Sequence, residues 1–334
     1  MTGYSDRRRI LRKIETERKS KAILYVTGDR PGMETQISPE VIDLFVDHLD
    51  ALWPSTKISL ILYTPGGNTA AAWRLVNLLR TFCDDLEVIV PSKALSAGTL
   101  ISLGANRILM TKQASLGPID PSLNGPLNPS VPGGAPNQKA PVSVEAVQGF
   151  LDVVQQQLGV NDSSSLASVW NHLSDKIHPL VLGQIFRSRS QIRTLAKRLL
   201  VHQGIDDDKR EGIISFLCSE SGSHDHSINR REAKSMGLNI ENPSDNFYQT
   251  LKKLHHSVAE TLLLRTPFSP DTTLGANQTM KYVLPRALIE SVKHGSHQFV
   301  SEGTISRLQL NIPGQPPQIG IQDSREFEGW RKEA

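Results

Sequence analysis

Two short segments of the sequence combine residue types suited to the chemistry of acyl groups. The first is Tyr63-Thr64-Pro65-Gly66-Gly67-Asn68, and the second is Ser96-Ala97-Gly98-Thr99. Each follows an apolar run typical of a buried strand and precedes a run of helical character. Two such turns in succession place the N–H groups of two helix starts at one end of a sheet. Such groups can hold an anion or a developing oxyanion.

The hydroxyl of Ser96 adds a nucleophile to this pair of turns. A serine between a strand and a helix projects its hydroxyl, and Gly98 lets the backbone turn tightly behind it. Ala97 offers an N–H group without bulk, and Gly66-Gly67 offers a second one free of side chains. The alternative interpretations are structural: a serine before a helix is commonly an N-cap, and Gly-Gly after a strand is commonly a plain turn. The occurrence of both segments in this order favours catalysis.

Apolar periodicity predicts the elements that position these turns. We expect strands over residues 22–28, 58–63, 86–90 and 107–110, a short extended segment over 114–119, and helices over residues 39–52, 69–82 and 96–105. This alternation predicts an α/β fold built from βαβ units. Later in the chain, residues 142–220 are predicted to be mainly helical, with residues 180–200 the clearest helix, followed by helices over 229–238 and 246–265.

The sequence divides into three predicted parts. Residues 1–20 form a basic N-terminal arm, and residues 21–265 form the core. Within the core, residues 121–141 contain six prolines among Gly, Asn and Ser, which predicts a mobile loop. Residues 266–334 are rich in Pro, Gly and polar residues, and we expect a C-terminal extension outside the core.

Composition indicates a globular protein of a reducing compartment. The chain has 334 residues, a net charge of +3 and only two cysteines, which cannot form a disulfide framework. No apolar run is long enough to span a membrane, and the N-terminus lacks the apolar core of a signal peptide. We therefore expect a cytoplasmic location.

The N-terminal arm concentrates the positive charge. Residues 1–22 hold eight Lys or Arg and three Asp or Glu. Apolar residues interleaved with the basic ones favour a packed or subunit-facing amphipathic helix. We expect no nucleic-acid partner, because no nucleic-acid-binding motif follows, while peripheral membrane contact through the arm stays open.

The order of the motifs resembles the Clp protease/crotonase superfamily, and within it the serine dehydrogenase proteinase family, relatives of signal peptide peptidase A. The resemblance covers roughly residues 20–265. It rests on the two turns, on Ser115-Leu116-Gly117-Pro118-Ile119-Asp120-Pro121, and on Ser223-His224-Asp225-His226 running into Glu232–Leu238. It implies an α/β spiral of ββα units with a mainly helical second half.

The same resemblance implies roles for single residues. Ser96 is the nucleophile, the N–H groups of Gly67 and Ala97 form the oxyanion hole, and Gly66 shapes its turn. The base is not where Clp proteases keep their histidine, because no histidine lies between His48 and His172. The two candidates are Lys139, which would form a Ser–Lys dyad, and His224, whose tautomer Asp120 or Asp225 could fix.

These observations predict a serine peptidase that forms an acyl-enzyme on Ser96. The alternatives are a crotonase-like acyl-thioester enzyme and a non-catalytic scaffold of the same fold. We expect no cofactor and no metal. The expected partners are a peptide or protein substrate, further copies of the chain in a homo-oligomer that use residues 142–220 as contact surface, and a separate unfoldase, since the chain has no ATPase motif of the Gly-x-x-x-x-Gly-Lys type.

Overall fold

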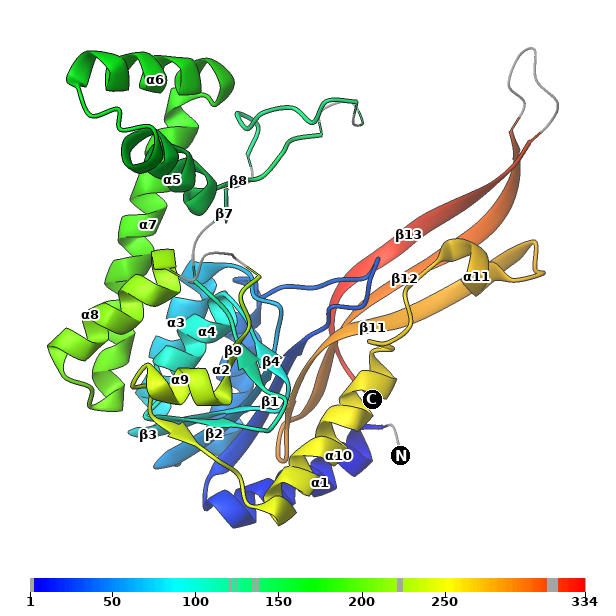
Figure 1. Cartoon of the computed structure of the whole chain (residues 1–334). Coiled ribbons are helices and arrows are strands. Elements are labelled where there is room, and N and C mark those ends of the chain that lie inside the picture. Colours follow the sequence, from blue (N-terminus) through cyan, green and yellow to red (C-terminus); the bar gives the residue numbers. More distant parts are fainter. Residues whose placement is uncertain are drawn as a thin grey trace.

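The computed structural model describes residues 3–119, 122–123, 125–133, 135, 138–220, 225–310 and 318–333 (Figure 1). Its first half alternates strands and helices. The elements are α1 (Tyr4–Arg18), β1 (Lys21–Thr27), α2 (Val41–Leu52), β2 (Lys57–Tyr63), α3 (Thr69–Phe82), β3 (Asp85–Val90), β4 (Lys93–Ala94), α4 (Ala97–Leu103), β5 (Arg107–Met110), β6 (Ser115–Leu116), β7 (Ser122–Leu123) and β8 (Val142–Ser143).

The second half begins with helices and ends with three long strands. The helices and short strands are α5 (Val144–Asp152), η1 (Val153–Gln157), α6 (Ser163–Lys176), α7 (Pro179–Leu200), η2 (Val201–Gln203), α8 (Asp207–Ser215), η3 (Phe216–Glu220), β9 (Ile228–Asn229), α9 (Arg230–Ser235), β10 (Ile240–Glu241), α10 (Asp245–Thr261) and α11 (Pro270–Leu274). The long strands are β11 (Thr279–Ser291), β12 (Gly295–Leu310) and β13 (Gln318–Lys332).

A mixed sheet forms the centre of the molecule. Within the described ranges its eight strands lie in the order β10-β5-β3-β2-β1-β11-β12-β13. The strands β1, β2, β3, β5 and β10 run parallel, and β11 joins β1 in antiparallel orientation. The carboxyl ends of β1, β2 and β3 therefore meet at one edge, which is where open parallel sheets bind their ligands.

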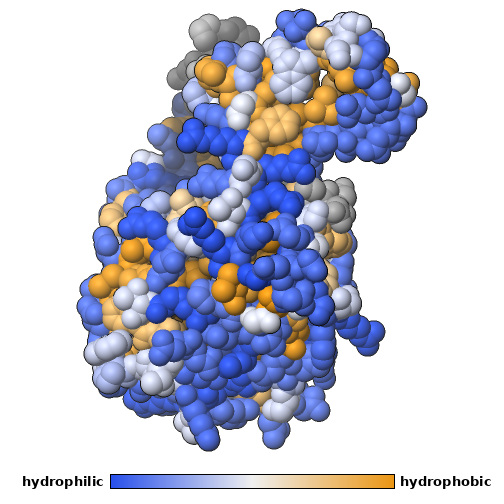
Figure 2. Space-filling model, turned by 90° about the vertical axis from the view of Figure 1, so that its left-hand side faces the viewer, coloured by the Kyte–Doolittle hydropathy of each residue, from blue (hydrophilic) through white to orange (hydrophobic). Residues whose placement is uncertain are grey.

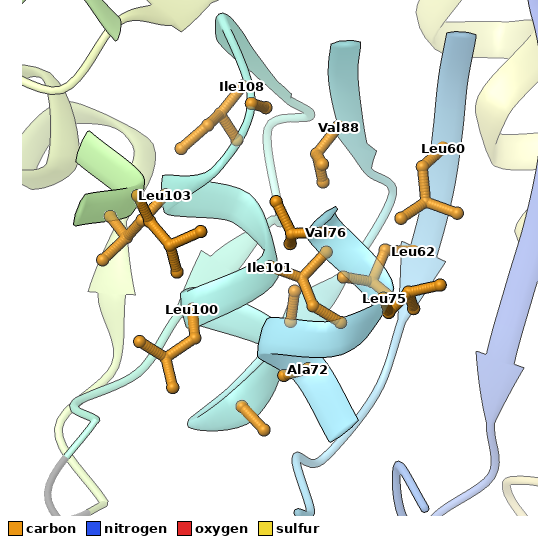
Figure 3. Close-up of a cluster of buried hydrophobic side chains, with 14 of the residues drawn as sticks. Leu60, Leu62, Ala72, Leu75, Val76, Val88, Leu100, Ile101, Leu103 and Ile108 are labelled. Atoms are coloured by element: carbon orange, nitrogen blue, oxygen red, sulfur yellow. The ribbon is translucent and has the colours of Figure 1, made fainter. Parts of the chain in front are cut away.

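Two hydrophobic layers cover the two faces of this sheet. On one face, α2, α3 and α4 pack with parts of α7 and α8 over buried Leu, Ile and Val side chains of the strands. Figure 3 shows this layer, in which side chains of α3 and α4 interleave above β2 and β3. On the other face, α1 and α10 lie side by side over buried residues of β1, β2 and β11 (Figure 1). The first turn thus begins on β2, a strand that is buried from both sides.

The N-terminal basic segment is a packed amphipathic helix, as the sequence favoured. Leu11 and Ile14 of α1 are buried against the sheet, and most of the basic side chains face outward. Arg7 is instead fully buried beside Glu290 of β11, and Arg18 pairs with the buried Glu87 of β3. An α/β fold class and the helical character of residues 142–220 are both confirmed.

The expectation for the C-terminal residues was wrong in one respect. Strand β11 is hydrogen-bonded to β1 in the middle of the sheet, and Leu288 and Ile289 belong to the core. The helices of the second half are followed by β11 to β13, which form a long projecting ribbon (Figure 1). Much of this ribbon is exposed on both faces, so its sequence lacks a strict apolar alternation, and Pro285 interrupts the register.

The helical lobe formed by α5, α6 and α7 carries apolar side chains at its surface. Figure 2 shows them as a patch in the upper part of the molecule. Exposed apolar residues there include Phe150, Leu158, Trp170, Leu180 and Phe186, and α6 has no buried residue among those described. The subunit contact expected for residues 142–220 stays a prediction.

A histidine cluster ties α2 to the C-terminal strands and makes stability depend on pH. His48 is fully buried; its Nδ1 lies 2.7 Å from Ser291 Oγ and its Nε2 lies 3.0 Å from His297 Nδ1. The pKa of His48 is lowered to about 3, mainly by burial and to a smaller extent by the charges of His294 and His297. The folded protein therefore keeps His48 neutral under conditions in which the unfolded chain binds a proton.

Acidification is expected to destabilise the protein through His48. Because the folded pKa lies below the unfolded one, near 6.5, stability is lost as pH falls below the unfolded value. This single group should cost about 2 kcal/mol between pH 7 and pH 5. Urea unfolding at both pH values measures the loss. The loss should shrink in His48→Gln and persist in His172→Gln, which changes an exposed residue of α6; an equal loss in His48→Gln would contradict the assignment.

Candidate active site

The first turn connects β2 to α3 and contains two glycines that need an unusual backbone. Gly66 has φ +123° and Gly67 has φ +142°, values that strain any residue with a side chain. Asn68 ends the turn as the N-cap of α3, and its side chain accepts a hydrogen bond from Ala71 N at 2.8 Å. The Pro-Gly-Gly-Asn sequence therefore stops β2 and starts α3 within a few residues.

A neighbouring segment lies tightly against this turn. Ile37 N donates to Gly66 O at 2.8 Å, and Asn68 N donates to Ile37 O at 2.8 Å. In this parallel bridge Ile37 makes both bonds, so the N–H group of Gly67 points away from Ile37. A Cβ atom at Gly67 would lie 2.4 Å from Ile37 N and 2.5 Å from Ile37 O, which leaves room for glycine alone.

The second turn places Ser96 directly before α4. Its backbone has φ 50° and ψ −112°, a conformation that is rare for a residue with a side chain. The serine at a nucleophile elbow is held in a similarly strained turn. Ser96 stands at the N-cap position, but its side chain makes no capping hydrogen bond. Ser96 therefore does not act as a capping serine, which was the structural alternative for this residue.

The structure brings the two turns into direct contact. Thr64 and Ala94 form a parallel bridge, in which Thr64 N donates to Lys93 O and Leu95 N donates to Thr64 O, both at 3.1 Å. A Cβ atom at Gly66 would lie 2.9 Å from Ser96 Cβ and 3.5 Å from Ser96 Oγ. Gly66 therefore lets the first turn approach the serine side chain.

The N–H groups of the two turns fall into two classes. Gly66 N donates to Thr64 Oγ1 at 3.0 Å, and Gly98 N donates to Leu95 O at 2.8 Å. The N–H groups of Gly67 and Ala97 have no acceptor among the residues that the structure describes. Such donors can stabilise the negative charge that develops on a carbonyl oxygen when a nucleophile attacks it.

Alanine at Gly67 is expected to slow acylation of Ser96 by about 10²–10³-fold, the usual cost of losing one oxyanion donor. The added Cβ would displace the turn from Ile37 and move the Gly67 N–H group. The measurement is the acylation rate with an activated aryl ester, alongside an unfolding curve. Gly204→Ala is the control, because Gly204 also has a positive φ, +68°, but nothing lies within 4 Å of its Cβ position. A folded Gly67→Ala variant that reacts at the wild-type rate would exclude this donor.

The candidate bases are not joined to Ser96 within the described residues. Lys139 Nζ donates to Ser130 Oγ at 3.1 Å, and these two residues form an isolated bridge at the surface. His224 and Asp120 lie outside the described residues. His226, two positions after His224, pairs with Glu232 at 2.7 Å. The structure thus brings together Ser96, Ala97, Gly66 and Gly67 and leaves the base a prediction.

Metal ligation has no support in the described part of the chain. No group of three or more His, Cys, Asp or Glu side chains is placed there to hold a metal ion. Cys83 and Cys218 are both buried and unpaired with each other.

Sequence reasoning missed a residue that contacts both turns. Asp29, two positions after the end of β1, binds Tyr63 from the first turn's strand and Lys93 from the second. Lys93, three residues before Ser96, forms an ion pair with Asp29. The sequence held one signal for Asp29: it follows β1, whose carboxyl end lies at the same edge of the sheet as the carboxyl end of β2.

Comparison with known proteins gives relatives for most of the chain. It is 27% identical over 256 residues to the uncharacterized protein MJ0137 of Methanocaldococcus jannaschii, covering 75% of this chain and 78% of the relative. A second protein of the same organism, the uncharacterized MJ1495, is 24% identical over 185 residues, covering 55% of this chain and 51% of the relative.

The solved structures to which the chain is similar include two proteases. A variant of the 1510-N membrane-bound stomatin-specific protease has a TM-score of 0.38 and 19% identity, covering 69% of this chain and 84% of that one. ClpP1 from Listeria monocytogenes has a TM-score of 0.37 and 17% identity, covering 70% of this chain and 97% of that one.

A family model covers both turns. Residues 49–146 match the ClpP-like SDH-type serine proteinases. This segment includes β2, the Gly66-Gly67 turn, Ser96 and Lys139. The match confirms the resemblance inferred from the sequence: this segment is similar to the ClpP-like SDH-type serine proteinases.

Proposed function

We propose that the protein hydrolyses peptide bonds through an acyl-enzyme on Ser96. The observation that carries the proposal is the placement of Ser96 in a strained turn, with a hydroxyl that does not cap its helix. This hydroxyl lies beside a turn whose Gly67 N–H group has no acceptor among the described residues. The match of residues 49–146 to a family of serine proteinases supports the reaction class.

The proposed reaction uses these groups in two steps. In the first, Ser96 Oγ bonds to the carbonyl carbon of the scissile peptide while a base takes the hydroxyl proton. The N–H groups of Gly67 and Ala97 bind the oxyanion, and the base returns the proton to the leaving amine as the C–N bond breaks. In the second, water attacks the acyl-enzyme with the help of the same base, and Ser96 is released with its proton.

Two residues are candidates for the base. Lys139 lies within the matched family segment and would have to leave Ser130 and become neutral. His224 precedes α9, and an imidazole needs little change in pKa to accept a proton near neutral pH. Asp120 is the candidate to orient an imidazole. A variant of each base separates the two hypotheses.

The substrates we propose are peptides or unfolded proteins, and the working state a homo-oligomer. ClpP-like proteases typically act on peptides and form oligomers. A separate unfoldase would have to supply unfolded chains. No helix of the described residues is both long and apolar enough to cross a bilayer.

A serine-reactive fluorophosphonate tests the proposal on the full chain. The probe should add once per chain, and mass spectrometry should place the adduct on Ser96. Ser92→Ala, four residues earlier in the same connection, is the matched control and should label normally. An adduct on another residue, or none in a folded protein, would reject Ser96 as nucleophile and favour a scaffold.

The same probe distinguishes the bases. Loss of the base should slow labelling by about 10²–10⁴-fold. Lys139→Ala is compared with Lys176→Ala, and His224→Ala with His226→Ala. If neither Lys139→Ala nor His224→Ala slows labelling, both hypotheses for the base fall.

A further inference from the structure

The carboxylate of Asp29 contacts side chains from both active-site turns. Its Oδ1 accepts a hydrogen bond from Tyr63 Oη at 2.6 Å. Its Oδ2 accepts one from the ammonium group of Lys93. Tyr63 is the last residue of β2, and Lys93 lies three positions before Ser96. A single side chain at the end of β1 thus links the segment that precedes Gly66-Gly67 to the segment that precedes Ser96.

These contacts lie in a partly dry environment on the α10 side of the sheet. About a quarter of each side chain of the ion pair is exposed, 24% for Asp29 and 28% for Lys93. Burial alone would raise the pKa of Asp29, but hydrogen bonds from Lys93 and Tyr63 outweigh it and hold that pKa below its usual value. The Lys93 ammonium also lies 5.5 Å from the centre of the Tyr63 ring. The carboxylate of Asp29, the hydroxyl and ring of Tyr63 and the ammonium group of Lys93 therefore hold one another in place.

The backbone of the two turns is joined directly next to these side chains. Thr64 follows Tyr63, exchanges hydrogen bonds with Lys93 and Leu95, and receives the N–H group of Gly66 on its hydroxyl. The Thr64 hydroxyl in turn lies 2.6 Å from that of Thr27, at the end of β1. The chain therefore contacts the junction twice at this point, through Thr27 at the end of β1 and through Asp29 two positions later.

We infer that Asp29 is a positioning residue that fixes the Gly66-Gly67 turn against the Ser96 turn, with Tyr63 and Lys93 as its two attachment points. Asp29 acts through these residues and touches no reacting atom. The inference rests on the proposed function for its effect on Ser96. An oxyanion hole with one donor from each turn works only while the turns keep their spacing.

The test combines amide hydrogen exchange with fluorophosphonate labelling of the full-length protein. Asp29→Asn keeps the size of the side chain and removes its charge. We expect the amides of Thr64 and Leu95, which bond across the junction, to exchange about tenfold faster, as the loss of a hydrogen bond to a charged group predicts. Labelling of Ser96 should slow by a similar factor, about tenfold.

Two further variants separate positioning from general stability. Lys93→Met should behave like Asp29→Asn, while Lys93→Arg, which keeps a cation for Asp29, should retain wild-type exchange and labelling. Asp85→Asn is the matched control: Asp85 is ion-paired to Arg107 at 3.2 Å with comparable exposure, at the opposite end of the strands. Its change should leave both turns unaffected.

The two readouts keep failure of this inference distinct from failure of the proposed function. Wild-type exchange at Thr64 and Leu95 in Asp29→Asn would overturn the inference, whatever the labelling rate. Faster exchange with unchanged labelling would overturn the role of Asp29 at Ser96. If wild-type Ser96 does not label, the proposed function fails, and exchange alone decides whether Asp29 holds the turns together.

Discussion

Ser96→Ala is expected to lower the rate of ester and peptide hydrolysis by at least about 10⁴-fold, because loss of the nucleophile removes the acyl-enzyme route. The residual activity would come from direct attack of water on the bound substrate, with the N–H groups of Gly67 and Ala97 stabilising the oxyanion. With an activated aryl ester, the wild-type protein should release a burst of one alcohol per chain before its steady rate. The burst should be absent in Ser96→Ala.

Ser92→Ala provides the comparison for this result. It changes the same functional group in the same connection between β3 and α4 and should keep the full burst. A burst that persists in Ser96→Ala would place the nucleophile elsewhere. Because α4 is fully buried and its N-terminal serine makes no capping bond, Ser96→Ala should leave the unfolding midpoint close to wild type.

Arg7→Met is expected to lower the free energy of unfolding by about 3–5 kcal/mol, the usual cost of leaving one partner of a buried ion pair alone. Arg7 and Glu290 are both 0% exposed, with Arg7 Nη2 2.6 Å from Glu290 Oε1. Arg7 Nη1 also donates to Thr261 Oγ1 at 2.7 Å, so the pair joins α1, α10 and β11. Urea unfolding at neutral pH measures the loss.

Two further variants identify the cause of that loss. Arg9→Met changes an exposed arginine of the same helix, 3.4 Å from Asp6, and should cost less than about 1 kcal/mol. The double variant Arg7→Met/Glu290→Leu replaces both charges by apolar groups and should recover much of the lost stability. If the double variant is as unstable as the sum of the single ones, then lost packing rather than the stranded carboxylate explains the effect.

The local parts of the fold were predictable from the sequence. The helix expected over residues 69–82 is α3, and the strand expected over residues 107–110 is β5. Their signals are short-range: Pro-Gly-Gly-Asn ends one element and caps the next, and apolar residues share one face. The helix expected over residues 96–105 is shorter, Ala97–Leu103, because Gly104 and Ala105 bond back to Ile101 and Ser102.

Long-range parts were not predictable from one sequence. Nothing in the residues after Thr266 indicates that β11 pairs with β1, since strand pairing depends on contacts between distant segments. Asp29 was missed for the same reason, because its partners Tyr63 and Lys93 are distant in sequence. Ser96, Gly66, Gly67 and Ala97 remain predictions in their roles, although their turns are placed side by side.

The pairing of β1 with β11 has a consequence for how the chain folds. Tyr25 in the first strand lies opposite Ile289, more than 260 residues later in the chain, so one edge of β1 stays open until that distant segment has been synthesised. Sheets closed by such distant segments fold slowly, and an open edge strand invites pairing with other chains. A nascent chain that already contains both turns therefore exposes an unpaired edge of β1, and we expect a chaperone to cover this edge during synthesis.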